Sequence, residues 1–582
     1  MFYMVPGTGY ICPLQMIQKL YQRLSELISL TFRHPGHLVW ILAAYIPFLG
    51  LYSVPLTGDQ KVYLNTALEM RERGSFLVPY LFGAPSYYKP PLHYWITMGS
   101  WKIFGFNLWG SLIPSVIATI ATAWFIGAIS NILHARHGRR WFSTAGAWFA
   151  LALGTVTFGT TAQMEIFTCL FYAAAWWAAL KFLAGPAQKR RWLWLYGAFA
   201  IAGLAAINKS PLYSVLWVAG FFSYVLFEGH WDLLRERRFY LAWLFGIAVG
   251  SVWYGSILIV DGQRFLTDYL VRETWNKRSG NRGSWWSLWL ALLYYCVPFT
   301  LMLLPSMRAI RRGRAWGLVR FLFCWCWAPA LFFTIYPYRV KAYFHMLVPA
   351  AALIVEWGYY HFSGKATFRW ATAVTGFLVF VALEGSALVL QRAWLVPAWI
   401  VTLFVLTGAT VFLFATRSWM RAFMLACFAG ILVFRIAAVS LGQQDIAGLR
   451  ASVASLPGHT RIGMYDEHQN IWHEFALMSV ALARADGTPP IERLDSLDKA
   501  VKLLRTGGLL ILSDEQDARL GRTLLAKYLG TGDRRELEDK PWPRWKSRIK
   551  FPYQKLLRGE LGKRSEILGM LQRNFRLKRV AN

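Results

Sequence analysis

Long apolar runs recur along most of the chain, and short polar segments separate them. A run of about 17–25 apolar residues is long enough for a helix to cross the hydrocarbon core of a membrane. Such runs predict thirteen transmembrane helices, near residues 38–56, 109–133, 141–161, 165–184, 192–208, 211–228, 239–260, 285–305, 317–336, 341–362, 368–391, 394–415 and 421–441. The pattern predicts a polytopic α-helical membrane protein and argues against a single water-soluble core.

The charges lie in the segments between these runs. The chain has 62 Lys and Arg residues against 30 Asp and Glu, a net charge of +32. An excess of this size can indicate nucleic-acid binding, but here the basic residues fall in short clusters between apolar runs, so no nucleic-acid partner is expected. Short basic loops mark the cytoplasmic side of a membrane protein. The basic clusters fall in alternate loops: Lys19, Arg23 and Arg33; Arg136, Arg139 and Arg140; Lys189, Arg190 and Arg191; Arg235, Arg237 and Arg238; Arg308, Arg311, Arg312 and Arg314; Lys365 and Arg369; Arg417 and Arg421.

This orientation predicts a multi-pass membrane protein with a cytoplasmic N-terminal segment, residues 1–37. The two long loops, 57–108 and 261–284, then lie outside. After the last span, apolar strands near 461–465 and 508–512 alternate with helical patterns at 470–484 and 497–506. An odd number of spans places residues 442–582 on the outer side as a small α/β domain.

The end of the chain, residues 540–582, is strongly basic. It carries thirteen Lys and Arg residues against Glu560 and Glu566. Two interpretations stay open for this basic tail. It is either a solvated extension or an arm that rests on the anionic headgroups of membrane lipids.

Ionisable residues gather at the outer ends of the predicted spans, which favours chemistry at the membrane surface over transport through the membrane. Asp59 follows the first span and opens an amphipathic helix that should end at Gly74; its simpler role is a helix cap. Lys89 precedes two prolines, and its simpler role is a lysine that snorkels to the interface. Glu165 begins an apolar helix, where a lone carboxylate is costly unless it is paired.

The first outer loop resembles that of one enzyme family. The order Gly58-Asp59, an amphipathic helix, Val78-Pro79, Gly83 and then Tyr88-Lys89-Pro90-Pro91-Leu92-His93-Tyr94-Trp95 resembles the bacterial lipid A aminoarabinose transferases and protein O-mannosyltransferases. These are integral-membrane glycosyltransferases of the GT-C fold that use polyprenyl-phosphate sugars. Stretches within 206–211, 272–283 and 338–349 also resemble the family. The chain departs from it at Gln60, where Glu is usual, at Val62, where Arg is frequent, and at Glu165, which takes the place of an Asp.

The resemblance implies that residues 38–441 form a GT-C catalytic domain in the bacterial inner membrane and that the outer domain, residues 442–582, lies in the periplasm. The expected reaction moves a sugar from an undecaprenyl-phosphate or other polyprenyl-phosphate donor to an envelope acceptor, lipid A, lipopolysaccharide or another glycolipid, at the periplasmic face. Phosphate leaves as a stable anion, so the site needs positive charge near its oxygens and no general acid. The candidates for this phosphate contact are Lys89, Lys209, Lys277, Arg278, Arg282, Arg339 and Lys341.

Asp59 is the expected base or acceptor-positioning carboxylate, and Glu165 is the second catalytic candidate. One base opposite the leaving phosphate predicts a single displacement with inversion. The substrate groove is expected to include Tyr63, Tyr88, His93 and Tyr343. No cofactor is expected, because no Asp-x-Asp, paired-His or dense carboxylate cluster suggests a metal site; dependence on a divalent ion is left open.

Three other interpretations remain. A protein hydroxyl could be the acceptor, as in the mannosyltransferases. A flippase or transporter of lipid-linked sugars should show polar residues through the bilayer centre and an internal repeat, and neither is clear in this chain. A non-catalytic scaffold could use the outer domain and the basic tail for binding.

Overall fold

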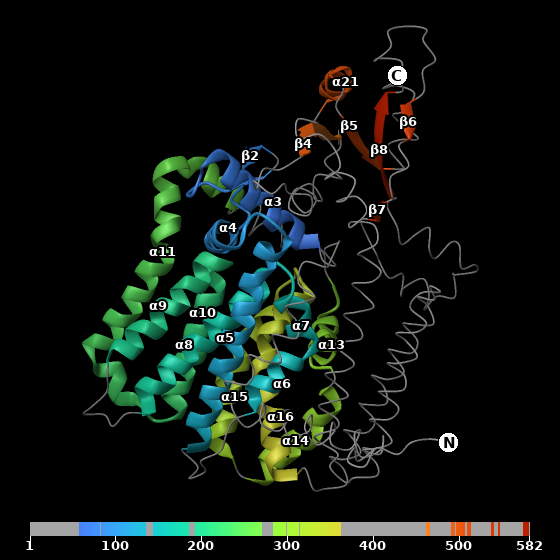
Figure 1. Ribbon diagram of the computed structural model, residues 1–582. Helices are drawn as coiled ribbons and strands as arrows, with labels where there is room; N and C mark the ends of the chain where they lie inside the picture. Colours follow the sequence, from blue (N-terminus) through green and yellow to red (C-terminus); the bar gives the residue numbers. More distant parts are fainter. Residues whose placement is uncertain are drawn as a thin grey trace, which may run out of the picture.

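Most of the described chain forms a bundle of helices, and a small sheet lies beyond one end of it (Figure 1). The computed structural model describes residues 58–81, 83–135, 144–184, 192–269, 283–297, 299–313, 315–362, 461–465, 491–494, 496–506, 509–513, 537–539, 545–546 and 574–580. The helices of the bundle are α5 (Leu108–Ala135), α6 (Ala145–Leu151), α7 (Leu153–Gly159), α8 (Met164–Ala184), α9 (Trp192–Asn208), α10 (Pro211–Phe227), α11 (Arg237–Leu266), α13 (Trp285–Tyr295), α14 (Thr300–Arg312), α15 (Trp316–Ile335) and α16 (Val348–Phe362). Two 3₁₀ helices, η4 (Trp231–Arg235) and η6 (Lys341–Leu347), join them.

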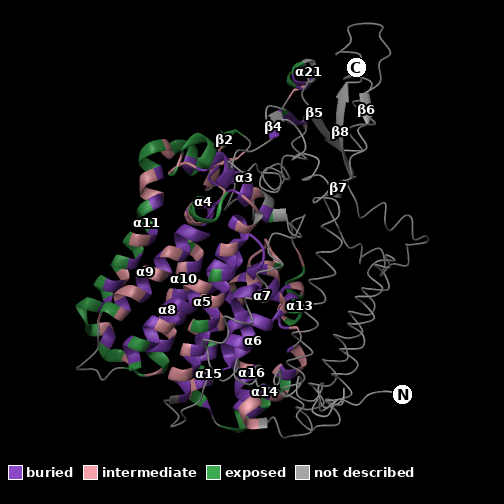
Figure 2. Ribbon diagram, viewed as in Figure 1, coloured by how far each residue is buried: buried purple, intermediate pink, exposed green. Residues whose placement is uncertain are grey.

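Within the described residues, four helices are long and apolar enough to cross a membrane. They cover Trp109–His134, Met164–Ala184, Arg237–Tyr269 and Trp316–Ile335, and α9 and α10 are shorter apolar helices. Side chains are buried between the helices and exposed on the outward faces of helices such as α11 (Figure 2). The first predicted span and the last three lie outside the described residues, so the number of thirteen spans stays a prediction.

Two predicted spans are broken, which differs from the expectation. The predicted helix 141–161 is two seven-residue helices, α6 and α7, which meet at an extended Ala152. The predicted helix 285–305 is the pair α13 and α14, bent by 94°. The two breaks pack together, because the Leu153 N–H donates to the Val297 carbonyl at 2.8 Å. Hydropathy counts apolar residues and does not detect such breaks, which depend on contacts between distant segments.

Helices α9 and α11 approach closely at three glycines. A Cβ at Gly203 would lie 2.5 Å from the Gly246 carbonyl oxygen, and Gly250 is also within contact range of Gly203. Small residues allow helix backbones in a membrane to approach in this way. This contact holds α11 against α9, whose last turn leads directly into the cavity described below.

We expect Gly203→Ala to destabilise the protein by about 1–3 kcal/mol, the usual effect of overpacking. Gly197, on the same helix, has no atom within 4 Å of an added Cβ. Gly197→Ala should therefore leave stability unchanged or raise it slightly. Thermal unfolding of both variants in detergent measures this, and equal effects would contradict the assigned helix contact.

Two further helices and a hairpin cover one end of the bundle. Helix α3 (Gly58–Arg73) ends where predicted, at Gly74 with a φ of +63°. Strands β1 (Tyr80–Leu81) and β2 (Ala84–Pro85) form an antiparallel hairpin, and α4 (Leu92–Phe104) follows. We call this end of the bundle the α3 end; it is the outer end in the orientation predicted from the loop charges.

The hairpin is fixed to α3 by two side chains of the helix. The Glu69 carboxylate accepts a hydrogen bond from the Gly83 N–H at 2.8 Å, and Arg73 donates to the Gly83 carbonyl at 3.2 Å. The Arg73 guanidinium also lies over the Tyr80 ring, 4.5 Å from its centroid. The loop between α3 and α4 therefore has a defined conformation, and it carries Tyr87, Tyr88 and Lys89 into place.

The C-terminal strands form one mixed sheet in the order β4-β3-β5-β8-β6, and β7 pairs with β8. Its elements are β3 (Ile462–Tyr465), β4 (Ile491–Leu494), α21 (Leu497–Arg505), β5 (Leu509–Ser513), β6 (Leu537–Asp539), β7 (Trp545–Lys546) and β8 (Asn574–Val580). Strand β3 runs parallel to both β4 and β5. Two strands and one helix lie where the sequence pattern predicts them; the expected helix at 470–484 lies outside the described residues. That these elements form a periplasmic domain stays a prediction.

Part of the basic tail is a strand of this sheet. Strand β8 pairs antiparallel with β5, β6 and β7. Residues 574–580 therefore form a strand of the sheet, and both interpretations of the basic tail stay predictions. The sequence pattern did not reveal this strand, because Arg576, Lys578 and Arg579 make the segment resemble a solvated basic run.

Ile462 and Met464 of β3 are buried in the same apolar cluster as Tyr63 and Leu64 of α3.

Candidate functional site

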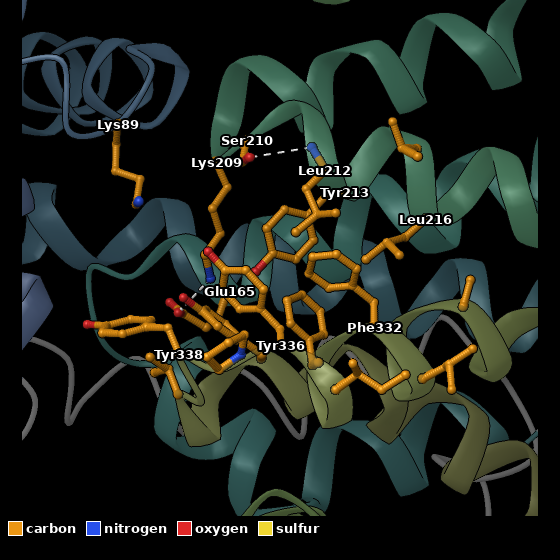
Figure 3. Close-up of a pocket in the computed structure, with 18 of the residues that line it drawn as sticks. Lys89, Glu165, Lys209, Ser210, Leu212, Tyr213, Leu216, Phe332, Tyr336 and Tyr338 are labelled. Atoms are coloured by element: carbon orange, nitrogen blue, oxygen red, sulfur yellow. Dashed lines mark hydrogen bonds and ion pairs between the residues drawn. The ribbon is translucent and has the colours of Figure 1, made fainter. Parts of the chain in front are cut away.

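A cavity of about 850 Å³ opens at the α3 end of the bundle. Its two ends differ in chemistry. One end carries the polar side chains of Asp59, Tyr63, Tyr88, Lys89, Glu165 and Lys209. The other end, where Figure 3 shows Leu216 and Phe332 away from Lys89 and Glu165, is lined by apolar residues of α10 and α15: Leu212, Val215, Leu216, Ala219, Ala328, Leu331, Phe332 and Ile335. The cavity is therefore amphipathic, with its charged groups gathered at one end.

Helix α3 supplies the first carboxylate. Asp59 lies in the first turn of α3, where the helix dipole favours a negative charge. Tyr63, one turn later, is 1% exposed and also lines the cavity. Burial, followed by the charges of Glu165 and Asp59, raises the pKa of Tyr63 well above its usual value. Its hydroxyl therefore stays protonated and can donate a hydrogen bond in the cavity.

The loop before α4 supplies the first lysine. Lys89 is buried, 7% exposed, and its Nζ lies 4.1 Å from the centroid of the Tyr88 ring. Two prolines follow it and restrict the backbone as the chain enters α4. A snorkelling lysine would extend to the aqueous interface, whereas this side chain lines the cavity wall.

Helices α8 and α9 supply a buried ion pair. Lys209 Nζ lies 2.7 Å from Glu165 Oε1, and both side chains are at most 5% exposed. In Figure 3, the side chains of Lys89 and Lys209 point into the same part of the cavity, and Lys209 reaches Glu165. The second oxygen, Glu165 Oε2, is buried with no hydrogen-bond partner among the described residues. Glu165 thus has one acceptor atom left for a further donor.

Local sequence explains where Lys209 lies. Helix α9 ends at Asn208, whose side-chain amide donates to the Met164 carbonyl at 3.4 Å and so fixes this end to the start of α8. Ser210 then caps α10, with Pro211 in its first turn. Lys209 is confined to the short break between the two helices. Its Nζ lies 5.3 Å and 5.5 Å from the ring centroids of Tyr213 and Tyr343.

The structure brings together seven of the predicted site residues. Asp59, Tyr63, Tyr88, Lys89, Glu165, Lys209 and Tyr343 all line the cavity. Four tyrosines that the sequence argument did not select also line it, Tyr213, Tyr269, Tyr336 and Tyr338. Tyr213 follows Lys209 by four residues, and Tyr336 and Tyr338 shortly precede Arg339, so nearness in the sequence to a predicted residue could have indicated these three.

Other predicted residues lie elsewhere. Arg339 donates to the Gly283 carbonyl at 2.7 Å and does not line the cavity. Lys341 is exposed at the start of η6. His93 lies behind the cavity wall, with its ring centroid 5.6 Å from Tyr63 and 5.2 Å from Phe167, and burial lowers its pKa to about 3, so the ring is neutral. Lys277, Arg278 and Arg282 fall outside the described residues, and their role stays a prediction.

The part of the chain that the structure describes contains no evident metal-binding site. No group of three or more His, Cys, Asp or Glu side chains there is placed to hold a metal ion. The charged groups of the cavity are the two carboxylates and two lysines already named.

The Glu165–Lys209 pair should be structural as well as functional. Glu165→Gln or Lys209→Met alone leaves one buried charge without its partner, and each should lower the free energy of unfolding by about 3–5 kcal/mol. The double variant removes both charges and should recover most of this loss. Thermal unfolding in detergent tests the coupling; strictly additive losses would show that the two side chains do not depend on each other.

The described chain has the features of a helical membrane protein with an amphipathic cavity at one end. Its fold is that of the crystal structure of ArnT from Cupriavidus metallidurans bound to undecaprenyl phosphate, with a TM-score of 0.63 and 15% sequence identity over 93% of this chain and 97% of that one. The apo structure of the same protein gives 0.63 and 17% over 84% and 95%.

Sequence comparison finds similar proteins over part of the chain. Residues 88–254 match the family model of dolichyl-phosphate-mannose-protein mannosyltransferases. The undecaprenyl phosphate-α-4-amino-4-deoxy-L-arabinose arabinosyl transferase of Pseudomonas aeruginosa is 25% identical over 328 residues, which are 53% of this chain and 58% of that protein. The chain thus matches little more than half the length of this curated relative. The resemblance seen in the sequence is confirmed: residues 88–254 match the mannosyltransferase family model, and the chain is similar to the aminoarabinose transferases in sequence and in fold.

Proposed function

We propose that this protein is an integral-membrane glycosyltransferase that moves a sugar from undecaprenyl phosphate to an envelope glycolipid. The observation that carries the proposal is the cavity itself. Two lysines and two carboxylates occupy one end, and an apolar channel between α10 and α15 forms the other. A polyprenyl-phosphate sugar has the same division between a charged head and a hydrocarbon tail.

The donor fits this cavity in one direction. Its isoprenoid tail lies against α10 and α15, because apolar side chains from both helices line that end. Its phosphate then meets Lys89 and Lys209. Both lysines are already largely shielded from water, so their interaction with an anion is stronger than at an exposed surface.

The proposed reaction is a single displacement. An acceptor oxygen attacks the anomeric carbon while the bond from that carbon to the phosphate oxygen breaks, and its electrons remain on undecaprenyl phosphate. Asp59 takes the proton of a hydroxyl acceptor or positions an acceptor phosphate, which needs no base. Glu165 orients Lys209 and offers its second oxygen to the sugar. Attack opposite the leaving phosphate inverts the anomeric centre, and a product of retained configuration would contradict this step.

Lipid A or a related glycolipid is the proposed acceptor, at the periplasmic face. The arabinosyl transferases among the relatives are named for an undecaprenyl-phosphate-linked donor; the resemblance of the first outer loop to the lipid A transferases supports the acceptor, and the charges of the loops support the orientation. A protein hydroxyl is the second candidate acceptor, because the family model that matches residues 88–254 is one of protein mannosyltransferases.

The experiment offers both acceptor classes to the same enzyme. Purified protein receives a panel of radiolabelled undecaprenyl-phosphate sugars together with a glycolipid fraction and a periplasmic protein fraction. The proposal predicts label on the glycolipid. Label on protein would show that the acceptor is a protein and not a glycolipid. Label that stays on the carrier across the whole panel would contradict the proposed transferase activity.

A further inference from the structure

One side-chain contact joins the loop that carries Lys89 to helix α11. The Tyr87 hydroxyl donates to Asp261 Oδ2 at 2.5 Å, across 174 residues of sequence. Tyr87 is 1% exposed, and its ring packs edge-on against Phe265, with centroids 5.4 Å apart. Burial and the Asp261 hydrogen bond raise the pKa of Tyr87, so the hydroxyl keeps its proton. Tyr87 immediately precedes Tyr88 and Lys89, both of which line the cavity.

Asp261 lies at the one break in the helical backbone of α11. Its φ of −147° and ψ of 46° are not helical, and the chain changes direction there before continuing to Leu266. In Figure 1, the last part of α11 turns over the hairpin of the α3 end. Beyond this turn, Phe265 stacks on Tyr269, four residues later, with ring centroids 5.3 Å apart, and Tyr269 lines the cavity.

A second contact fixes the same loop to α11 at its other end. The Trp253 indole N–H donates to the Leu77 carbonyl at 2.9 Å. Tyr87, Trp253 and Phe265 belong to one buried aromatic cluster that joins the loop and the helix. The loop is thus held from both sides, by α3 through Glu69 and Arg73 and by α11 through Trp253 and Asp261.

We propose that Tyr87 and Asp261 are positioning residues, which hold Lys89 and Tyr269, both in the lining of the cavity, in the relation that the donor phosphate and sugar require. This proposal rests on the proposed function, because it assigns Lys89 to the donor phosphate. Tyr87 and Asp261 touch neither the donor nor the acceptor in this arrangement. They act through the two segments that they join.

The chain offers a matched control. Tyr254 lies on the same helix and belongs to the same aromatic group, but its hydroxyl donates to the Ala206 carbonyl of α9 at 3.0 Å. Tyr254→Phe therefore removes one half-buried tyrosine hydroxyl whose hydrogen bond is to α9 and not to the loop. Tyr87→Phe removes the other hydroxyl and keeps the ring that packs on Phe265.

The first measurement is hydrogen exchange, which does not depend on transferase activity. Tyr87→Phe and Asp261→Ala should each speed exchange in residues 76–91 and 261–269, and Tyr254→Phe should leave the 76–91 segment unchanged. Unchanged exchange in Tyr87→Phe, or equal acceleration in Tyr254→Phe, would overturn the link between loop and helix. This test of the link between loop and helix gives an answer whether or not the protein transfers sugar.

The second measurement is a double-mutant cycle with Lys89. Tyr87→Phe should lower kcat/KM about tenfold, mainly through kcat, the scale of one hydrogen bond to a charged group. In the Lys89→Met background the same change should have less than about twofold further effect, because the lysine that it positions is gone. A full tenfold loss in both backgrounds would show that Tyr87 acts independently of Lys89 and would overturn the positioning role.

Discussion

Asp59→Asn should reduce sugar transfer by about 100- to 10,000-fold, the range expected for loss of a positioned general base. Asparagine keeps the size of the side chain and its place in the first turn of α3, so the fold should be unchanged. The carboxylate alone is removed from the polar end of the cavity. Steady-state transfer from a labelled undecaprenyl-phosphate sugar to glycolipid measures the effect.

The matched control is Glu72→Gln, which neutralises another carboxylate on α3. Glu72 is exposed and does not line the cavity. It should retain wild-type transfer. If the two variants lost activity equally, the loss would reflect the net charge of α3, and Asp59 would have no specific role as base or as acceptor-positioning group.

Lys89→Met should lower kcat by about 100- to 1,000-fold, the scale observed when one preorganised group that stabilises developing charge is removed. Methionine preserves the unbranched apolar stem, so packing beside Tyr88 should persist. The charge that meets the leaving phosphate disappears, and the barrier to breaking its bond to the sugar rises. Single-turnover kinetics with prebound donor isolates this chemical step.

Lys102→Met is the control for this change. Lys102 lies in the last turn of α4 and is exposed, so it shares the region and the charge of Lys89 but not its place in the cavity. Its transfer rate should match that of the wild type. A Lys89→Met enzyme with normal single-turnover kinetics would contradict the assignment of Lys89 to the leaving phosphate.

Sequence reasoning indicated much of the candidate site, because the charged residues of this site occur in short motifs. Asp59, Lys89 and Lys209 each occur next to a glycine, a proline or a helix end, where a charged residue in an apolar chain is conspicuous. Glu165 was found because a carboxylate at the start of an apolar helix is costly unless paired, and the structure supplies the partner, Lys209. The sequence indicated that a partner was needed without indicating which residue it was.

The remaining features depend on contacts between segments far apart in the chain. Nothing local to Tyr87 indicates that Asp261 accepts its hydrogen bond. The break at Ala152 interrupts an apolar run that hydropathy treats as one helix. Arg339 lies in a basic stretch that resembles the family, yet its guanidinium binds a backbone carbonyl. Motifs therefore indicated which residues have the right chemistry, and only tertiary packing decides which of them share a cavity.

The most direct test of the proposed function follows the fate of one labelled sugar in sealed vesicles. The protein is reconstituted with radiolabelled undecaprenyl-phosphate sugar and glycolipid acceptor, and both lipids are separated after incubation. Transfer predicts that label appears on the glycolipid together with an equal amount of free undecaprenyl phosphate, and that Asp59→Asn abolishes both. Label that remains on the carrier but changes leaflet would contradict the glycosyltransferase and identify a flippase instead.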